Sequence, residues 1–340
     1  MHAPDFWRES RGLLAWILSP LSALYGAVAR YRLARAAPSA NIPAIAIGGL
    51  TLGGDGKTPL ALALASVLMA QGERPAFLTR GFGRRRKTGE DPFVVDLSRD
   101  SAKDAGDEAL LLARLAPTIV CADRKAGARL AEAQGASILL MDDGLHSRRL
   151  EPDLAILVVD ADYGAGNGFC PPSGPLRAPL AAQLSRADLL VLIGKGEAFT
   201  PPPKKLVLRA RFAPASEAVA RLKGKKVFAF AGIGRPGKFA ATLREIGADL
   251  VGFRWFPDHH AYSSRDLASL AREAERRDAL LVTTQKDSAR IGSEAPAESV
   301  PVKLEFDQPG AFEELLTAAL LRARAERMSR RSRARSELLP

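Results

Sequence analysis

A short glycine-rich segment, Thr51–Thr58, constrains the fold of this chain more than any other feature. It reads Thr-Leu-Gly-Gly-Asp-Gly-Lys-Thr, follows the apolar run Ile42–Gly48, and precedes an apolar stretch that begins at Pro59. The backbone N–H groups of a glycine-rich turn and of a helix N-terminus converge on an anion, and glycine lets the backbone approach that anion closely. The order of strand, loop and helix therefore predicts a loop that binds nucleotide phosphates.

Each residue of the predicted phosphate loop has an expected task. Lys57 would reach the β- and γ-phosphates of ATP, and the hydroxyl of Thr58 would ligate Mg²⁺. Thr51 stands where the first glycine of such a loop usually lies, but the part from Gly53 to Thr58 resembles the variant with paired glycines. A glycine turn that carries Gly-Lys-Thr by chance is the alternative. The expected contacts to ATP come from Thr51, Leu52, Gly53, Gly54, Asp55, Gly56, Lys57 and Thr58.

Short apolar runs alternate with longer helical patterns through most of the chain. Before the triple proline Pro201–Pro203, the runs expected to form strands are Ile42–Gly48, Pro75–Thr79, Phe93–Asp96, Thr118–Ala122, Ser137–Asp142, Leu154–Asp160 and Asp188–Ile193. This alternation predicts a P-loop NTPase-like α/β fold, with a mostly parallel sheet and helices on both faces. A second, smaller α/β domain follows. We expect an apolar helix at 1–35, the nucleotide-binding domain at 36–203, the second domain at 204–322 and a basic tail at 323–340.

The first apolar segment, Gly12–Ala29, contains no charged residue and lies between Arg11 and Arg30. As a helix it would be about 27 Å long, which is short for a bilayer span. Pro20 in its middle would kink a spanning helix. Aromatic residues in and beside the segment favour a membrane interface. We therefore expect a membrane-associated helix that lies in the interface rather than across the bilayer, with a buried first helix as the alternative.

Composition narrows the classes of partner. The chain has 49 Lys and Arg against 38 Asp and Glu, a formal charge of +11. Such a surplus suits nucleic acid, acidic lipid headgroups or a phosphorylated substrate, although a solvated basic surface explains any single cluster. Two cysteines, Cys121 and Cys170, are too few for a disulfide framework, which indicates a reducing compartment. Neither belongs to a Cys/His cluster, which argues against structural zinc.

Acidic residues end two of the predicted strands. A phosphate loop needs a further carboxylate to hold Mg²⁺, usually at the carboxyl end of a neighbouring strand. The run Ser137–Met141 ends in Asp142 and Asp143, which we expect to supply it. Leu154–Asp160 has the same form, but there we favour an aspartate that only begins a turn.

Two further groups could serve proton transfer. Asp107 and Glu108 open a helical pattern, where acids also stabilise the first turn of a helix. A kinase that acts on a hydroxyl needs a group that accepts or orients its proton, and this need favours a catalytic role for Asp107. His259 and His260 follow a strand of the second domain. One of them could reach across a cleft to these acids, and a surface histidine is the alternative.

A series of motifs runs in order from the phosphate loop to about residue 292. They are Gly53–Pro59, Thr79–Arg84, Gly106–Glu108, Asp123–Arg124, Asp142–Gly144, Gly166–Gly168 with Ser173–Arg177, Ala231–Pro236, Asp258–His259 and Thr284–Asp287. Together with the N-terminal apolar helix, this series resembles the tetraacyldisaccharide 4′-kinase family of lipid A biosynthesis.

The resemblance implies transfer of the ATP γ-phosphate to the 4′-hydroxyl of a tetraacylated glucosamine disaccharide 1-phosphate, at the cytoplasmic face of the bacterial inner membrane. Asp107 and His259 would form a catalytic pair beside Lys57, and Asp142 and Asp143 would handle Mg²⁺ and its waters. Four residues would contact substrate or phosphate, namely Arg80, Glu108, Arg124 and Asn167.

The chain departs from the family pattern at two places. The family usually has Phe-Gln-His where this chain has Leu145-His146-Ser147, and glutamate where it has Gln285. Polar roles at these positions are therefore open. The competing interpretations are a soluble P-loop ATPase of the partitioning or metal-insertion type, a membrane scaffold that binds nucleotide without turnover, and a nucleic-acid-binding protein. We expect no nucleic-acid partner, because no basic platform with interleaved aromatic residues is found.

Overall fold

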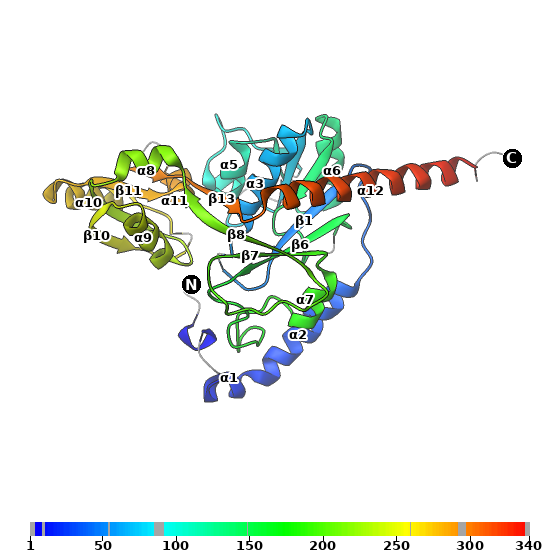
Figure 1. The fold of residues 1–340 in the computed structure, drawn as a ribbon, viewed down its shortest axis with the longest axis horizontal. Helices are drawn as coiled ribbons and strands as arrows, with labels where there is room; N and C mark the ends of the chain where they lie inside the picture. The colour runs from blue at the N-terminus through cyan, green and yellow to red at the C-terminus, as the bar shows by residue number, and fades with distance from the viewer. Residues whose placement is uncertain are drawn as a thin grey trace.

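The computed structural model describes residues 4–8, 11–53, 55–84, 92–147, 149–258, 260–291 and 297–336. It contains a large and a small β-sheet, each with its own helices (Figure 1). The strands of the large sheet are β1 (Ala44–Gly49), β2 (Pro75–Thr79), β3 (Phe93–Val94), β4 (Thr118–Val120), β5 (Ile138–Met141), β6 (Leu154–Asp160), β7 (Leu189–Ile193), β8 (Leu206–Pro214) and β13 (Val302–Phe306). Those of the small sheet are β9 (Lys226–Ala231), β10 (Asp249–Trp255), β11 (Leu280–Thr284) and β12 (Glu298–Val300).

The large sheet has nine strands in the order β13-β8-β7-β6-β1-β5-β2-β4-β3. All neighbours are parallel except β13 with β8 and β3 with β4. The central strand β1 is buried along its whole length, as its small and branched apolar residues predict. Because β5 and β6 flank β1, the carboxyl ends of all three strands meet at one edge, where ligands bind in open α/β sheets.

Helices cover both faces of the large sheet. Those of this part of the chain are η1 (Asp5–Trp7), α1 (Leu13–Ile17), α2 (Ser19–Ala34), α3 (Lys57–Ala70), α4 (Ala102–Ala105), α5 (Asp107–Ala113), α6 (Arg124–Ala133), α7 (Leu180–Arg186) and α12 (Pro309–Ser336). Residues of α3, α5 and α12 share one apolar core with the sheet, while α6 and α7 contribute to cores that contain the alternate residues of the strands. Side chains of successive strand residues point to opposite faces, and this produces the two layers.

The small sheet has four parallel strands in the order β10-β9-β11-β12. Its helices are α8 (Ser216–Leu222), α9 (Pro236–Glu245), α10 (Ser264–Arg276) and α11 (Gln285–Ile291). Aromatic residues dominate one of its cores, where the rings of Phe230, Phe256 and Tyr262 meet edge to face. In Figure 1 this domain lies to the left of the large sheet, and β8 and β13 lead to it.

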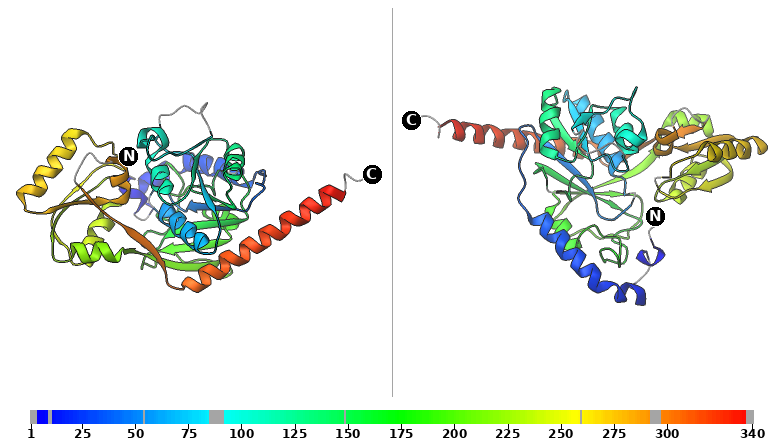
Figure 2. Two further views of the ribbon diagram at one scale, coloured as in Figure 1. Left: turned by 90° about the horizontal axis from the view of Figure 1, so that it is seen from above. Right: turned by 180° about the vertical axis from the view of Figure 1, so that it is seen from behind.

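The C-terminal helix α12 packs against the large sheet. Phe312, Leu316, Leu320 and Ala323 are buried, and their spacing of three or four residues places them on one face of the helix. Burial of a large apolar side chain contributes about 1.5–3 kcal/mol, so this face attaches the helix firmly. Both views of Figure 2 show that the end of α12 projects beyond the body of the molecule.

The predicted α/β fold is confirmed, but the sheet topology differs from the predicted division at residue 203. The range 204–322 includes β8 and β13, which pair with each other in the large sheet, and most of the buried face of α12. The small sheet and its helices occupy only Ser216–Val300. The range 323–340 is not a separate tail, because α12 continues without a break to Ser336. After the small sheet, the chain comes back to the large sheet at β13. Local sequence patterns could not predict this, because the pairing of β8 with β13 joins segments that are far apart in sequence.

The predicted first helix is two helices. α1 ends at Ile17 and α2 begins at Ser19, with Pro20 in its first turn, where a missing N–H breaks no hydrogen bond of the helix. In the part of the chain that the structure describes, we find no helix with the length and apolar character that a membrane crossing requires. Instead, α2 packs against the large domain. A Cβ added at Gly26 would lie 3.3 Å from Pro179, and the hydroxyl of Ser22 donates to the carbonyl of Cys170.

Candidate functional site

The phosphate loop connects β1 to α3 at the carboxyl edge of the large sheet. Gly53 and Gly56 have positive φ angles of 130° and 94°, a conformation that glycine adopts without strain. Gly56 directly precedes α3, so the first N–H groups of the helix face the loop. The ammonium of Lys57 lies 3.4 Å from the carbonyl oxygen of Gly53, folded back over the loop. Gly54 lies outside the described residues.

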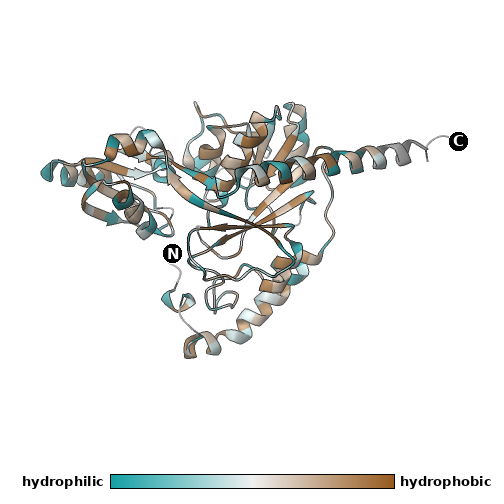
Figure 3. Cartoon of the chain, viewed as in Figure 1, coloured by the Kyte–Doolittle hydropathy of each residue, from teal (hydrophilic) through white to brown (hydrophobic). Residues whose placement is uncertain are grey.

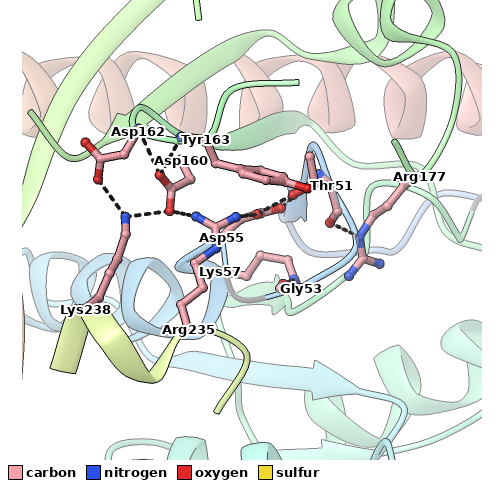
Figure 4. Close-up of polar contacts among 10 residues, drawn as sticks. All are labelled: Thr51, Gly53, Asp55, Lys57, Asp160, Asp162, Tyr163, Arg177, Arg235 and Lys238. Atoms are coloured by element: carbon pink, nitrogen blue, oxygen red, sulfur yellow. Dashed lines mark hydrogen bonds and ion pairs between the residues drawn. The ribbon is translucent and has the colours of Figure 1, made fainter. Parts of the chain in front are cut away.

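Two side chains hold the loop in shape (Figure 4). The buried carboxylate of Asp55 accepts hydrogen bonds from the N–H of Thr51 at 2.9 Å and from its hydroxyl at 2.6 Å. From outside the loop, Arg177 donates to the carbonyl of Thr51 at 2.9 Å and also pairs with Asp143. The threonine that breaks the usual glycine pattern is therefore the residue to which Asp55 is bonded.

Two cations near the start of α9 join the second domain to the phosphate loop and to the end of β6 (Figure 4). Arg235 forms an ion pair with Asp160 and lies 3.5 Å from a carboxylate oxygen of Asp55. Lys238 pairs with Asp160 at 2.6 Å and with Asp162 at 2.8 Å. Asp160 also accepts the N–H groups of residues 162 and 163, so it begins a turn as expected, but it joins the two domains as well.

The acids after β5 face the start of α3. The hydroxyl of Thr58 lies 3.3 Å from Oδ2 of Asp142. Burial, together with the negative charges of Glu108 and Asp143, raises the pKa of Asp142 to about 7. Burial would also raise the pKa of Asp143, but the cations of Arg177 and Lys57 outweigh it and leave the pKa well below its usual range. Neighbouring acids thus differ in charge state near neutral pH.

These acids fit a magnesium ion. Oδ1 of Asp142 and Oδ1 of Asp143 are buried and lack a hydrogen-bond partner among the described residues. A buried carboxylate oxygen without a partner is costly, unless a ligand or water completes it. No group of three His, Cys, Asp or Glu side chains within the described ranges forms a metal site by itself. Mg²⁺ is usually held by one or two carboxylates together with phosphates and waters, so Thr58 and Asp142 suit it.

The first turn of α5 presents two acids toward the second domain. Gly106, with φ of 93°, precedes them, and a Cβ there would lie 2.8 Å from the carbonyl oxygen of Phe82, so a larger residue would not fit. Asp107 is 5% exposed and pairs with Arg290 of α11 at 2.6 Å. Glu108 pairs with Lys286 at 2.8 Å. Both acids thus lie where α5 meets α11 of the second domain, and their roles in the reaction stay predictions.

Of the two adjacent histidines, His259 lies outside the described residues. The ring of His260 stacks on Phe256 with centroids 4.7 Å apart, and its Nε2 lies 3.3 Å from Asp266. Both partners belong to the second domain. His260 is thus part of that domain's packing, and the role of His259 stays a prediction from its motif.

The residues expected to contact substrate differ in their surroundings. Arg80 is exposed beyond the end of β2 and is available to an anion. Arg124 has no exposed surface and donates to the carbonyls of Leu78 and Asp142, while burial lowers its pKa to about 10. Asn167 is also buried and donates to the carbonyls of Phe6 and Ser173. Arg124 and Asn167 are thus buried and bonded to backbone carbonyls, and their contact with a substrate stays a prediction.

A family model described as tetraacyldisaccharide-1-P 4′-kinase matches residues 14–321. The chain belongs to this family. The predicted membership, which rested on the order of the motifs, is confirmed.

Relatives extend over nearly the whole chain. A tetraacyldisaccharide 4′-kinase of Bradyrhizobium diazoefficiens is 47% identical over 341 residues, covering 97% of this chain and 100% of the relative. One of Methylobacterium nodulans is 48% identical over 331 residues, covering 95% of each. The crystal structure of LpxK from Aquifex aeolicus in complex with ATP is similar, with a TM-score of 0.74, 26% identity, and coverage of 91% of this chain and 100% of that chain.

Several contacts of the site could not be predicted from the sequence. The sequence predicts Asp55 as a contact to ATP and assigns no role to Arg177, but the bonds of both residues to Thr51 become visible only in three dimensions. Arg235 and Arg290 belong to the second domain, and a basic residue at the start or end of a helix is common. The spacing of Lys286 and Arg290, four residues apart in α11, was the one available signal that both face the same way.

Proposed function

We propose that this chain is an ATP-dependent kinase that phosphorylates the 4′-hydroxyl of a tetraacylated glucosamine disaccharide 1-phosphate. Membership in the tetraacyldisaccharide-1-P 4′-kinase family supports the substrate class. The observation that carries the chemistry is the position of the phosphate loop beside Asp142, with the Thr58 hydroxyl 3.3 Å from the carboxylate. The similar LpxK structure from Aquifex aeolicus is described as a complex with ATP, which supports ATP as the donor.

The loop residues of this chain would grip the triphosphate. The N–H groups at the start of α3 and the ammonium of Lys57 supply positive charge where the β- and γ-phosphates lie in P-loop proteins. Thr58 and Asp142 would hold Mg²⁺, with Asp143 next to them. When bound, this ion neutralises part of the charge that develops on the transferred phosphoryl group. These groups are fixed before the reaction by Asp55 and Arg177, which favours electrostatic stabilisation.

Asp107 is the group that we assign to the acceptor hydroxyl. In the reaction the 4′-oxygen forms a bond to the γ-phosphorus, the bond from the γ-phosphorus to the bridging oxygen of ADP breaks, and the hydroxyl proton passes to Asp107. His259 would act with Asp107, as the Asp-His motif implies. Phosphoryl transfer depends mostly on positioning and charge, so Asp107 needs only to orient the hydroxyl and take up its proton.

The acylated substrate requires a lipid surface, and α1 and α2 offer one. Their exposed apolar residues recur every three or four positions on one face, at Ile17, Leu21, Leu24, Val28 and Tyr31. Figure 3 shows apolar residues along these helices on the outside of the molecule. Arg11, Arg30, Arg32 and Arg35 flank this face in sequence and suit anionic headgroups. We propose interfacial binding at the cytoplasmic face of the inner membrane, where ATP is available.

Binding to vesicles tests the membrane surface. Leu21→Gln with Leu24→Gln removes two side chains that are 58% and 65% exposed. Burial of each contributes about 1–2 kcal/mol, so partitioning into phosphatidylglycerol-containing vesicles should fall by at least about tenfold. Leu321→Gln is the matched control, because Leu321 is 62% exposed on α12. Equal partitioning of the double variant and the wild type would remove this surface from the proposal.

An assay with labelled ATP tests the kinase activity. Purified protein, Mg²⁺ and ATP labelled in the γ-phosphate are incubated with the tetraacylated disaccharide 1-phosphate or with its deacylated form. We expect label in the acylated lipid, and Lys57→Ala should reduce the rate by about 10²–10⁴. An ATPase of the partitioning type would instead release labelled phosphate regardless of lipid and would dimerise with nucleotide. That outcome would replace the proposed function by the alternative.

A further inference from the structure

Helix α11 of the second domain packs directly against α5, the helix that carries the two acids. Arg290 donates from Nε to Oδ2 of Asp107 at 2.7 Å, and its Nη2 lies 2.6 Å from the same oxygen. One turn earlier on α11, the ammonium of Lys286 lies 2.8 Å from Oε1 of Glu108. Two successive acids are thus matched with two cations that are four residues apart.

Arg290 is itself held in a fixed orientation. Its Nη1 donates to Oδ1 of Asp287 at 2.7 Å and to the carbonyl of Gly232 at 2.6 Å. Asp287 has no exposed surface and also accepts hydrogen bonds from Thr284 and Tyr262. A guanidinium has donors in a rigid plane, so fixing one side of the plane fixes the side that faces Asp107.

The residues that fix Arg290 explain part of a motif to which the sequence assigned no task. Thr284 and Asp287 are the first and last residues of the Thr284–Asp287 motif, and Lys286 lies between them. A Cβ at position 232 would lie 2.8 Å from the Tyr262 hydroxyl and 3.1 Å from Asp287, so Gly232 leaves room for these bonds. The motif therefore shapes one face of α11 toward α5.

The charges around the acids make this pairing necessary. Glu108 lies close enough to Asp142 to raise its pKa, so Asp107, Glu108, Asp142 and Asp143 form one acidic region. Burial would lower the pKa of Arg290, but Asp107 and Asp287 raise it above its usual value. Burial would also lower the pKa of Lys286, but the negative charges of Glu108 and Asp107 outweigh it and raise the pKa above its usual value. Both cations remain charged and offset the repulsion among the carboxylates.

We propose that Arg290 and Lys286 are positioning residues that fix the carboxylates of Asp107 and Glu108 for the acceptor hydroxyl. The inference rests on the proposed function, because it assigns Asp107 to that hydroxyl. Both contacts from Arg290 reach Oδ2, so they fix the position of this carboxylate oxygen relative to α11. Lys286 holds the carboxylate of Glu108 toward α11. This limits the approach of Glu108 to Asp142 and to the phosphates. The second domain thereby completes the acid pair of the first.

A double-mutant cycle separates positioning from general support of the fold. The variants are Arg290→Met, Asp107→Asn and their combination, with Arg290→Lys as the conservative form. Arg221→Met is the matched control, because Arg221 pairs with Glu298 at 2.7 Å on the second domain without contact to the acids. For each variant, kcat, the KM for ATP, and the nucleotide affinity are measured with the acylated disaccharide.

We expect Arg290→Met to lower kcat by about 30–300-fold while the KM for ATP changes less than about threefold. Arg290→Lys should recover at least about tenfold of the loss, because it restores the charge. In the Asp107→Asn background, Arg290→Met should cost little more, since the two residues act as a unit. The control should stay within about twofold of the wild type.

Lys286→Met keeps the test decisive if Arg290→Met does not fold. Lys286 is less buried than Arg290, with 23% of its side chain exposed against 6%, and its loss should lower kcat by about 5–30-fold. Wild-type kcat in Lys286→Met, or an undiminished effect of Arg290→Met in the Asp107→Asn background, would overturn the inference. A wild-type protein that transfers no phosphate to the lipid would overturn the proposed function and this inference with it.

Discussion

Asp55 offers a sharp test of how the phosphate loop is built. Its carboxylate lies inside the loop, where it accepts the N–H and the hydroxyl of Thr51 and approaches Arg235 of the second domain. A Cβ at Gly49 would lie 2.5 Å from its Oδ2, so the backbone packs closely around it. Replacement by alanine removes the acceptor of both Thr51 donors and leaves the surrounding chain unchanged.

The magnitude follows from the two donors. A buried donor without an acceptor costs about 1–3 kcal/mol, so Asp55→Ala costs about 2–6 kcal/mol if the loop keeps its conformation. The free variant can instead turn Thr51 toward water, and ATP binding must then restore the loop. At least about 2 kcal/mol of this cost should appear in the affinity, which weakens the Kd for ATP by about 30-fold or more.

Thr51→Val is the matched variant for this measurement. It removes the hydroxyl and keeps the N–H, so it loses one of the two hydrogen bonds, and the Kd for ATP should weaken by about fivefold. Affinity is measured by titration with a fluorescent ATP analogue in the presence of Mg²⁺. An Asp55→Ala variant that binds ATP within about threefold of the wild type would refute the assignment of Asp55 as the internal support of the loop.

Three further predictions concern other parts of the chain. Thr58→Ala should raise the Mg²⁺ concentration at half-maximal rate by about tenfold while Thr58→Ser restores it, and equal Mg²⁺ dependence would remove Thr58 from the metal site. Burial raises the pKa of Cys170 to about 11, so its thiol should react with iodoacetamide at pH 8 about 10²-fold more slowly than a free cysteine. Fast labelling would show that α2 detaches from the segment around Cys170. Gly48→Ala brings a Cβ within 2.4 Å of Leu145 and should lower the free energy of unfolding by about 1–3 kcal/mol in thermal denaturation, whereas an unchanged melting temperature would contradict this packing.

The phosphate loop and the strands around it could be predicted because their signals are local. Leu154–Asp160 and Pro75–Thr79 form strands with the predicted ends, since buried parallel strands are continuous apolar runs. Asp142 could be placed beside Thr58 because the carboxyl ends of neighbouring parallel strands share one edge.

Contacts between distant segments could not be predicted. Arg290 reaches Asp107 across 183 positions of the sequence, and no local pattern distinguishes this arginine from others on exposed helices. The return of β13 to the large sheet has the same cause, because the strand alternates between partly buried and exposed residues and fits either sheet.

At both departures from the family pattern, the side chain of this protein has a specific hydrogen-bond partner. His146 lies next to Gln183, with Nε2 2.8 Å from Oε1, and burial lowers its pKa to about 4. The ring is therefore neutral near pH 7 and packs behind the phosphate loop, where Gln183 donates to Leu50. Gln285 accepts the N–H of Val302 at 3.3 Å, so an amide at this position joins α11 to β13.

The central claim is that a sugar hydroxyl receives the γ-phosphate of ATP at this edge of the sheet. The most direct measurement is ³¹P nuclear magnetic resonance, with mass spectrometry, of the lipid recovered after reaction with ATP and Mg²⁺. We predict one new phosphomonoester at the 4′ position for each ADP released, and none with Lys57→Ala. Release of ADP without a new phosphomonoester, or phosphate on a different hydroxyl, would contradict the account.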